Sequence, residues 1–423
     1  MKILLSAHAC NPELTSEYVV GWRCLLAVAS KHEVWLLTAE RNRPALERAQ
    51  ASGSLPANVR INFAGKPFQQ HENQMAAKLQ EWPYYTEFLK AARSVALDLH
   101  STVGFDLVHH STFATWRVSV PYWELGIPFV IGPIGGGEIF NLRYLSQLSW
   151  IARFFECARN AATLSSILNP RVRRTFEKAS VILSANAETS RIVSRFTRDP
   201  SRIRSLLVTC FPKEIIARYS VGGKKNWDGT LRLAGGGTCE GRKGVLLVMK
   251  SLQIVKQRGI PFHYTFAGSG PEAKFLLKKR DQMGLTAEVD ILPNLKREDY
   301  LEHLEKTHIY LLPSLRDNSP VALMEAMLAR CVPIVAACNG PAVIVNSSCG
   351  YSVSIDDPSQ LILNMAEIVA QLHADREKLQ SLAESASRRI AEDFDDSNYS
   401  RVVEDAYQQA RTKLSLPTQS HGD

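Results

Sequence analysis

Two acidic side chains, Asp317 and Glu325, lie on either side of a predicted turn between a strand and a helix. The run Ile309–Leu312 is short, apolar and bounded by turn residues, which predicts a buried strand. Ser319 suits the N-cap and Pro320 the first helical position, so a helix should follow. The free backbone N–H groups at the start of this helix suit a phosphate. Glu325 would need a partner among apolar neighbours, such as the hydroxyls of a ribose; the alternative is a solvent-exposed glutamate.

A glycine-rich stretch, residues 235–244, follows the predicted strand at 231–235. Glycines let the backbone approach a phosphate, and the adjacent cations Arg242 and Lys243 suit a diphosphate. The alternative is an ordinary tight turn. The spacing lacks the third glycine of a dinucleotide-binding fingerprint. We find no cluster with metal-ligand spacing and expect neither a metal nor another cofactor.

Other predicted strands also end in candidate residues. In the second half, the strand at 262–267 is followed by Gly268 and Gly270, and the strand at 289–292 by Asn294 and Leu295. Each could be an ordinary turn residue, and each histidine in the first half could be a satisfied core histidine. The first half places these residues after its strands: His109, His110, Asn11, Glu17, Gly135, Gly136 and Glu138.

Short apolar strands alternate with helical segments twice along the chain, which predicts two doubly wound α/β domains with parallel sheets. The linker should lie where prolines, glycines and a lysine pair break the pattern. The predicted parts are a first domain at 1–208, a linker at 209–228, a second domain at 229–396, a helix at 397–414 that returns to the first domain, and a tail at 415–423.

The composition is that of a soluble globular protein, with 45% hydrophobic and 22% charged residues among 423. No apolar run approaches the roughly 18 residues that span a bilayer. The first residues read as a strand because His8 and Pro12 interrupt any signal-peptide pattern. Eight cysteines without a Cys-x-x-Cys pair indicate free thiols in a reducing cytoplasm. The net charge of +8 indicates an anionic partner: a nucleotide diphosphate, a nucleic acid or an anionic membrane.

Residues 141–178 combine a basic excess with interleaved aromatic side chains. Seven cations face two acids, a balance of 7 − 2 = +5. A basic, aromatic amphipathic helix can lie on an anionic membrane surface. The alternative is a packed helix with a solvated arginine face.

The order of residues around Asp317 and Glu325 resembles the nucleotide-sugar signature of the retaining glycosyltransferases of family 4. Pro-Ser precedes the acid, Glu-Ala-Met follows it, and a Val-Pro-Ile-Val run comes next. Lys243 with the following Gly is similar to that family's diphosphate loop. The family usually has Glu where this chain has Asp317, and an arginine where this chain has Thr238, so Arg242 would take its place. The resemblance is strongest over residues 231–335.

The resemblance implies a GT-B fold, with two Rossmann-like domains facing across a cleft. It implies transfer of a hexosyl group from a UDP- or GDP-sugar to a hydroxyl of a lipid-linked or glycan acceptor, with retained configuration and without a metal. Acceptor contacts would come from Asn11, Glu17, Gly135, Gly136 and Glu138. Catalytic residues would be His109, His110, Asp317 and Lys243, and donor contacts would come from Gly237, Thr238, Arg242, Lys243, Gly268, Gly270, Asn294, Leu295, Asn318, Ser319, Pro320, Val321 and Glu325.

The enzyme would work in the cytoplasm, at the inner face of the plasma membrane where 141–178 binds anionic lipid. One alternative is a sugar-nucleotide epimerase of the same shape, which would need further acid and base carboxylates. Another is a non-catalytic basic protein that binds nucleic acid. The chain lacks a recognisable helix-turn-helix, zinc or RNA-binding signature, so we expect no nucleic-acid partner.

Overall fold

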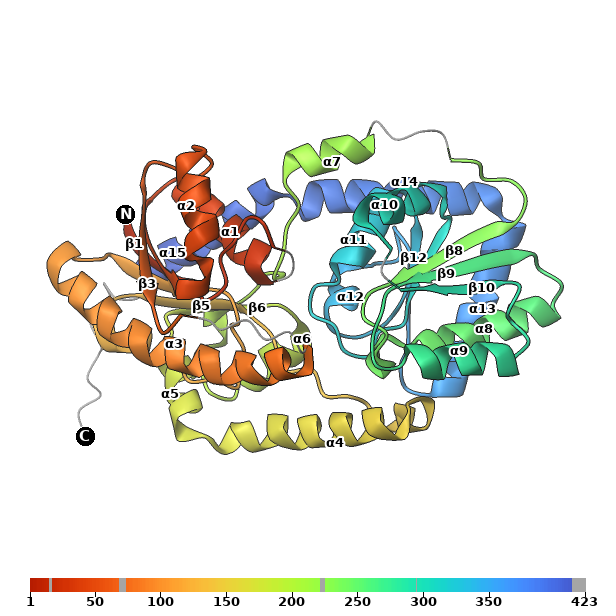
Figure 1. The fold of residues 1–423 in the computed structure, drawn as a ribbon, viewed down its shortest axis with the longest axis horizontal. Helices are drawn as coiled ribbons and strands as arrows, with labels where there is room; N and C mark the ends of the chain where they lie inside the picture. Colours follow the sequence, from red (N-terminus) through yellow and green to blue (C-terminus); the bar gives the residue numbers. More distant parts are fainter. Residues whose placement is uncertain (15–16, 68–73, 221–224, 294, 413–423) are drawn as a thin grey trace. The chain divides into compact units, whose positions relative to one another are not determined.

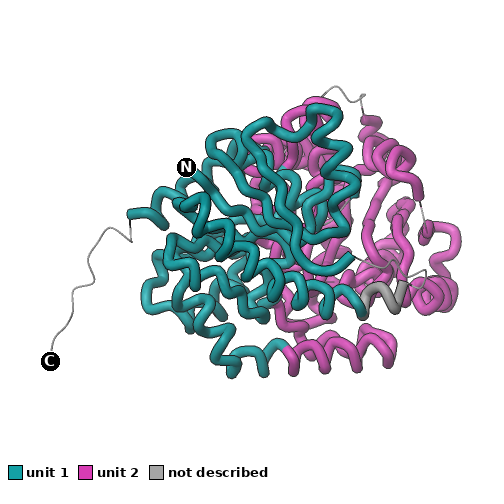
Figure 2. Tube along the Cα trace, turned by 60° about the vertical axis from the view of Figure 1, so that its left-hand side comes forward, with its two compact units in different colours: residues 1–137, 163–210, 396–423 teal, residues 138–162, 211–395 magenta. Residues whose placement is uncertain are grey.

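The computed structural model describes residues 1–14, 17–67, 74–220, 225–293 and 295–412. The chain forms two compact units (Figure 2). Unit 1 comprises residues 1–137, 163–210 and 396 onward, and unit 2 comprises 138–162 and 211–395. Within the described part of the chain, no helix combines the length and apolar composition needed to cross a membrane.

Unit 1 is built on a seven-stranded sheet in which every paired strand is parallel, in the order β3-β2-β1-β4-β5-β6-β7. Its inner strands are apolar and buried on both faces, as expected for a parallel sheet covered by helices. The strands are β1 (Lys2–Ser6), β2 (Glu33–Ala39), β3 (Val59–Ala64), β4 (Leu107–His110), β5 (Phe129–Ile134), β6 (Val181–Ser184) and β7 (Ile203–Ser205).

Helices cover this sheet, and the last helix of the described chain is one of them (Figure 1). Helix α15 buries Tyr399, Val403 and Tyr407 in the same core as β1 and α1. The side chains of Asn169 and Asn186 cap α5 and α6 by accepting backbone N–H groups. The helices of unit 1 are α1 (Glu17–Ala29), α2 (Arg43–Ala51), α3 (Gln74–Val103), α5 (Pro170–Lys178), α6 (Ala187–Val193) and α15 (Asp396–Thr412).

Unit 2 contains a six-stranded parallel sheet in the order β10-β9-β8-β11-β12-β13. The strands are β8 (Leu231–Gly236), β9 (Phe262–Ala267), β10 (Val289–Leu292), β11 (Ile309–Leu312), β12 (Val332–Ala336) and β13 (Tyr351–Val353). The helices are α7 (Lys213–Ser220), α8 (Val245–Gln257), α9 (Ala273–Gln282), α10 (Arg297–Lys306), α11 (Val321–Leu328), α12 (Asn339–Ile344), α13 (Pro358–Ala374) and α14 (Arg376–Asp393), together with most of α4 (Trp150–Ser165).

The units differ from the predicted domains at residues 138–162 and at the predicted linker. Residues 138–162, predicted within the first domain, belong to unit 2 because Phe140, Tyr144 and Leu148 are buried in its core with Leu246. The predicted linker at 209–228 contains helix α7, and the division between the units falls after Cys210. The predicted returning helix is α15 of unit 1, and the predicted tail lies outside the described residues.

The segment 141–178 is not one basic helix. It forms α4 and, after a short break, α5. Several of its charges are paired within the fold: Arg173 with Glu177 (2.8 Å), and Arg174 over the ring of Trp123 (4.6 Å).

Candidate functional site

The strand order of unit 2 reverses between β8 and β11, and the carboxyl ends of strands at such a point are where open α/β sheets form a binding crevice. The chain runs from β8 outward through β9 and β10, and from β11 outward in the opposite direction through β12 and β13. Loops after two such neighbouring strands diverge, and ligands of open α/β sheets bind at this switch point. The two loops here are residues 237–244 and 313–320, which contain most of the predicted donor residues.

Backbone contacts tie these two loops together. The N–H of Leu315 donates to the carbonyl of Arg242 (2.8 Å). Gly244 has φ +72°, and a Cβ there would lie 2.4 Å from the carbonyl oxygen of Pro313, so only glycine fits this close approach. The Arg242 guanidinium donates to the Arg316 carbonyl (2.8 Å) and to Glu240 (2.5 Å). The loop that carries the cations is therefore held against the loop that carries Asp317.

Lys243 and Asp317 form an ion pair across the crevice. Their side chains are only 11% and 13% exposed. Charges held so far from water need a partner, and each supplies one for the other. The structure therefore brings together two of the residues predicted to be catalytic.

Helix α11 follows the second loop, and its first backbone N–H groups lie at the end of that loop. It begins at Val321, and Pro320 takes the cap position with no side-chain cap. The prediction of Ser319 as the N-cap is wrong by one residue, because Pro320 has ψ 89° and so precedes the helix. The N–H groups of Val321 and Ala322 have no acceptor within the helix, as at any helix start.

The remaining residues of this loop are pinned to α12. The N–H of Gly340 donates to the carbonyl of Asp317 (2.9 Å). A Cβ at Gly340 would lie 1.7 Å from the carbonyl oxygen of Asn318, so the backbone there is closely packed. Asn318 is thus held against α12, and Ser319 follows it half-buried.

Glu325 is buried in α11, with its side chain 4% exposed, and pairs with Arg297 of α10 (2.5 Å). The side chain of Arg297 is 54% exposed, so this partner can be reached from solvent. Tyr300 is close by: burial raises its pKa, and the negative charge of Glu325 adds to the effect. Sequence reasoning missed Arg297 and Tyr300, since nothing local marks a partner 28 residues from Glu325.

The predicted glycines near this crevice serve close packing of loops. A Cβ at Gly268 would lie 1.8 Å from the carbonyl oxygen of Gly237, and a Cβ at Gly270 would lie 2.6 Å from that of Cys239. Thr238 contributes a carbonyl that accepts the N–H of Glu240 (2.7 Å). Leu295 follows β10 and is partly buried. Asn294 lies outside the described residues.

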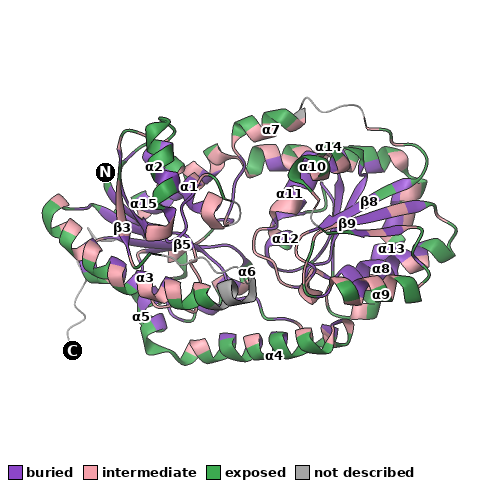
Figure 3. Ribbon diagram, viewed as in Figure 1, coloured by how far each residue is buried: buried purple, intermediate pink, exposed green. Residues whose placement is uncertain are grey.

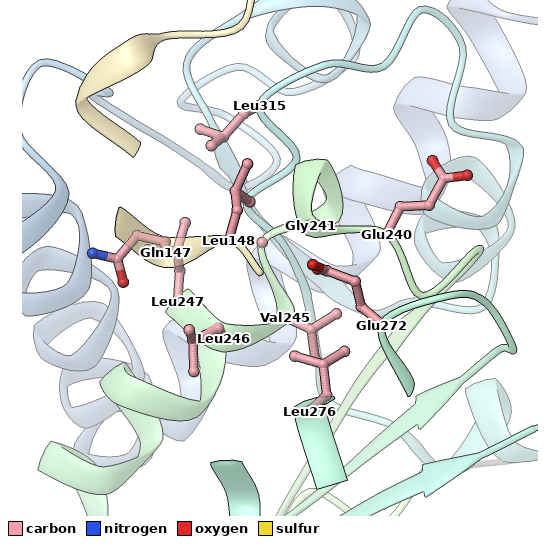
Figure 4. Close-up of a pocket in the computed structure, with 11 residues that line it drawn as sticks. Gln147, Leu148, Glu240, Gly241, Val245, Leu246, Leu247, Glu272, Leu276 and Leu315 are labelled. Carbon is pink, nitrogen blue, oxygen red and sulfur yellow. The ribbon is translucent and has the colours of Figure 1, made fainter. Parts of the chain in front are cut away.

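The segment at 138–162 also contacts the cationic loop. Figure 4 shows Leu148 and Glu272 beside Gly241. A Cβ at Gly241 would lie 2.4 Å from Leu148 and 2.8 Å from Glu272, so a larger residue would displace one of them. The Glu272 carboxylate accepts the N–H of Ser149 (3.1 Å). Leu148 and Glu272 therefore pack against the loop at 237–244.

The two predicted histidines lie in the interior of unit 1. His109 shares hydrogen bonds with the Tyr407 hydroxyl and the Gly132 carbonyl, both at 2.7 Å, and burial lowers its pKa to about 4. His110 shares hydrogen bonds with Ser6 (3.1 Å) and Tyr85 (2.9 Å). Burial, and then the charge of His109, lower its pKa to about 3. Both rings are fully buried and neutral, and both nitrogens of each are occupied, an arrangement that stabilises the fold.

The switch point of unit 1 lies between β1 and β4. His8 follows β1, is buried, and has no partner for Nε2 among the described residues. Burial, and then the charge of Arg41, lower its pKa. Glu17 accepts the N–H of Phe113 (3.2 Å); burial raises its pKa, and this N–H partly offsets the shift. Asn11 accepts the N–H of Glu13 (2.8 Å). His8 is a polar residue at a strand end that sequence reasoning did not assign to the site.

The predicted acceptor residues after β5 divide between the units. Gly136 has φ +92°, and a Cβ there would lie 2.4 Å from the Thr115 hydroxyl. Gly135 pairs with the same threonine in an isolated bridge. Glu138 belongs to unit 2, is buried, and lies 3.7 Å from Arg159.

Two doubly wound parallel sheets with these topologies define the GT-B fold, so the prediction of that fold is confirmed. Residues 236–389 match the model of the family described as "Glycosyl transferases group 1". This part of the chain is therefore similar to the group 1 glycosyltransferases. It contains both loops of the crevice.

Solved structures share the fold over nearly the whole chain at low identity. HepE from Anabaena in complex with UDP is 13% identical, with a TM-score of 0.62 over 98% of this chain and 100% of that chain. Sucrose-phosphate synthase from Thermosynechococcus elongatus is 13% identical, with a TM-score of 0.62 over 97% and 99%. WaaG, a glycosyltransferase involved in lipopolysaccharide biosynthesis, is 14% identical, with a TM-score of 0.54 over 98% and 99%. No curated protein sequence gives a significant match.

Proposed function

We propose that this protein is a retaining, metal-independent glycosyltransferase that takes a hexosyl group from a nucleoside diphosphate sugar. The observation that carries the proposal is the crevice between β8 and β11, where Lys243, Arg242 and the first amides of α11 are assembled. Two cationic side chains and free N–H groups suit a diphosphate. The family match over the same loops, and the UDP in the structurally similar HepE, support a UDP-sugar as donor.

In this proposal the ion pair opens when the donor binds. Lys243 and Arg242 turn to the diphosphate, whose negative charge grows as the bond to the sugar breaks, and fixed positive charge in a site with little water is most effective there. Asp317, released from Lys243, accepts hydrogen bonds from sugar hydroxyls. The cations do the work that a divalent ion does in metal-dependent transferases.

The second carboxylate would hold the nucleoside. Glu325 is buried on α11, and its partner Arg297 is half-exposed and able to move aside. Vicinal ribose hydroxyls are good donors for a buried carboxylate, which otherwise pays a large desolvation cost. Glu325 is thus the residue we assign to the ribose.

The acceptor would be a hydroxyl of a lipid-linked or glycan intermediate, used in the cytoplasm. The proposal assigns Asp317 to the sugar hydroxyls and Glu325 to the ribose, and it assigns no described carboxylate of the crevice to nucleophilic attack. Retention would then follow front-face attack, with the departing phosphate accepting the proton of the acceptor hydroxyl. Asn11 and Glu17 remain our candidates for acceptor contacts.

A thermal-shift panel of UDP, GDP, ADP and their sugars tests the proposal. One diphosphate should stabilise the wild type, because ligand that binds only the folded state adds about 2.7 kcal/mol at 100 times its Kd. Lys243→Gln and Glu325→Ala should lose about half or more of that gain. Lys278→Gln, an exposed lysine on α9, is the matched control. Equal responses in all three variants would refute the assignment.

A further inference from the structure

Helix α4 has its apolar face outward and its polar face inward, the reverse of an ordinary surface helix. Trp150, Phe154 and Phe155 are 76%, 69% and 63% exposed. Glu156 and Asn160, on the opposite face, are buried. Figure 3 shows the exposed colour along much of this helix. Three large aromatic side chains in one and a half turns are an exposed apolar patch of the kind that marks an interaction site.

Specific polar contacts fix this orientation within unit 2. Glu156 accepts a hydrogen bond from Arg316 (2.8 Å). The side-chain amide of Asn160 makes two hydrogen bonds to the backbone of Phe140, each 2.9 Å. The aromatic face cannot turn inward without breaking them. Since Glu156 is the sole acid of α4, the outward face carries Arg153 and no carboxylate.

A cavity of 360 Å³ lies at the start of this helix, against α8 and α9. Three cations and no acid line it, with apolar side chains between them: Arg153, Lys250 and Lys279, with Leu246, Phe275 and Met283. This is the composition of a site for an anion attached to an apolar group.

The cations of the cavity have neutral partners. Lys250 donates to Gln147 (2.6 Å), Lys279 to Gln282 (3.2 Å) and Arg153 to the carbonyl of Leu148 (3.1 Å). Among the described residues no carboxylate forms an ion pair with any of them. Burial, and then the charge of Lys279, lower the pKa of Lys250. An anion entering the cavity would therefore relieve repulsion between the cations.

We propose that unit 2 docks on an anionic lipid bilayer, with the outward aromatics of α4 in the interface and a lipid headgroup phosphate in the cavity. Tryptophan and phenylalanine beside basic residues favour the headgroup region of a membrane. Anionic lipid also complements the three cations and the net charge of +8. A phospholipid supplies an anionic phosphate together with apolar chains, which matches exposed aromatic side chains beside a basic cavity without acids.

Docking would set the position of the nucleotide crevice relative to the lipid surface. Leu148, which lines the cavity, also packs on Gly241 of the cationic loop. Arg316, which holds Glu156, precedes Asp317. The inference needs only the residues of α4 and the cavity, so it stands or falls apart from the donor assignment.

Flotation of the full chain with phosphatidylcholine vesicles, with and without phosphatidylglycerol, tests the docking. The wild type should float with the anionic vesicles. The double variant Phe154→Ser/Phe155→Ser should bind these vesicles at least about tenfold more weakly than the wild type. Lys250→Gln/Lys279→Gln should lose the preference for anionic lipid. The matched controls are Leu363→Ser, an exposed leucine of α13, and Lys274→Gln/Lys278→Gln on α9; both should float like the wild type.

Three results would overturn the proposal: no flotation of the wild type, equal flotation of all variants, or self-association that the phenylalanine variant abolishes in the absence of vesicles. Free inorganic phosphate should not release the protein from vesicles; release by phosphate, or thermal stabilisation by phosphate without any vesicle binding, would assign the cavity to a free anion. UDP should raise the thermal stability of these variants as much as that of the wild type. The UDP response therefore tests the donor site separately from vesicle binding.

Discussion

Replacement of Asp317 by Asn should tighten the binding of a bare nucleoside diphosphate while reducing sugar transfer. The Asp317 carboxylate forms an ion pair with the ammonium group of Lys243. A diphosphate must compete for that group and also approach a like charge. Asn keeps the size of the side chain and removes both penalties.

The magnitude follows from the geometry of the pair. Two unit charges about 4 Å apart interact by about 1 kcal/mol in water and about 4 kcal/mol at an effective dielectric constant of about 20. With side chains 11% and 13% exposed, the crevice lies between these limits. We expect a gain of about 1.4 kcal/mol, or about tenfold in Kd, for Asp317→Asn. Lys243→Gln removes the attraction itself and should weaken binding about thirtyfold, or about 2 kcal/mol.

Isothermal titration of both variants with UDP measures these effects, and a transfer assay with the sugar nucleotide measures turnover. The two halves of the ion pair should change UDP affinity in opposite directions, and both variants should transfer sugar more slowly. Urea unfolding controls for the loss of the pair, which should lower the free energy of unfolding of both variants because the remaining polar group loses its partner. If the pair only stabilises the fold, both variants will shift UDP affinity in the same direction or not at all, which would refute the reasoning.

Three further predictions concern residues around the two switch points. Glu325→Ala should weaken UDP by about tenfold but 2′-deoxy-UDP by much less, since the carboxylate is assigned to the ribose hydroxyls; equal losses for the two ligands would remove that role. Gly268→Ala should lower the free energy of unfolding by about 2 kcal/mol because its Cβ would lie 1.8 Å from the carbonyl oxygen of Gly237; an unchanged urea midpoint would contradict this close packing. The folded pKa values of His109 and His110, about 4 and about 3, lie below the unfolded value of about 6.5. The unfolded state therefore binds protons first as the pH falls. The contribution of the two neutral rings to the free energy of unfolding is complete above pH 6.5 and decreases below it. Between pH 6 and pH 5, where few carboxylates titrate, each histidine should lower the free energy of unfolding by about 1.4 kcal/mol per pH unit. Urea unfolding should show that the wild type takes up about one proton more on unfolding than His109→Gln does. A free energy of unfolding that does not change with pH would show these rings to be accessible.

The parallel strands were predictable because strands buried on both faces are continuous apolar runs. The predicted strand at 309–312 is β11, and the predicted strand at 231–235 is nearly all of β8. The crevice could be located as well, since loops after neighbouring parallel strands meet at one edge of a sheet. The sequence therefore predicts that both Lys243 and Asp317 lie at this edge, where the structure pairs them.

Contacts between distant residues could not be predicted from local pattern. The apolar side chains at Phe140, Tyr144 and Leu148 recur every four residues and indicate a packed segment, but spacing does not say which sheet they join. His109 looked available at a strand end, yet its partner Tyr407 lies 298 residues away. The outward aromatic face of α4 was equally hidden, because it depends on Glu156 reaching Arg316.

Hydrogen–deuterium exchange with and without UDP tests most directly whether the crevice of unit 2 binds the diphosphate. The amides of residues 237–244 and of 315–325 should exchange more slowly when UDP is bound, and Lys243→Gln should abolish that protection at the same nucleotide concentration. Protection confined to unit 1, or protection in unit 2 that Lys243→Gln leaves unchanged, would contradict the account.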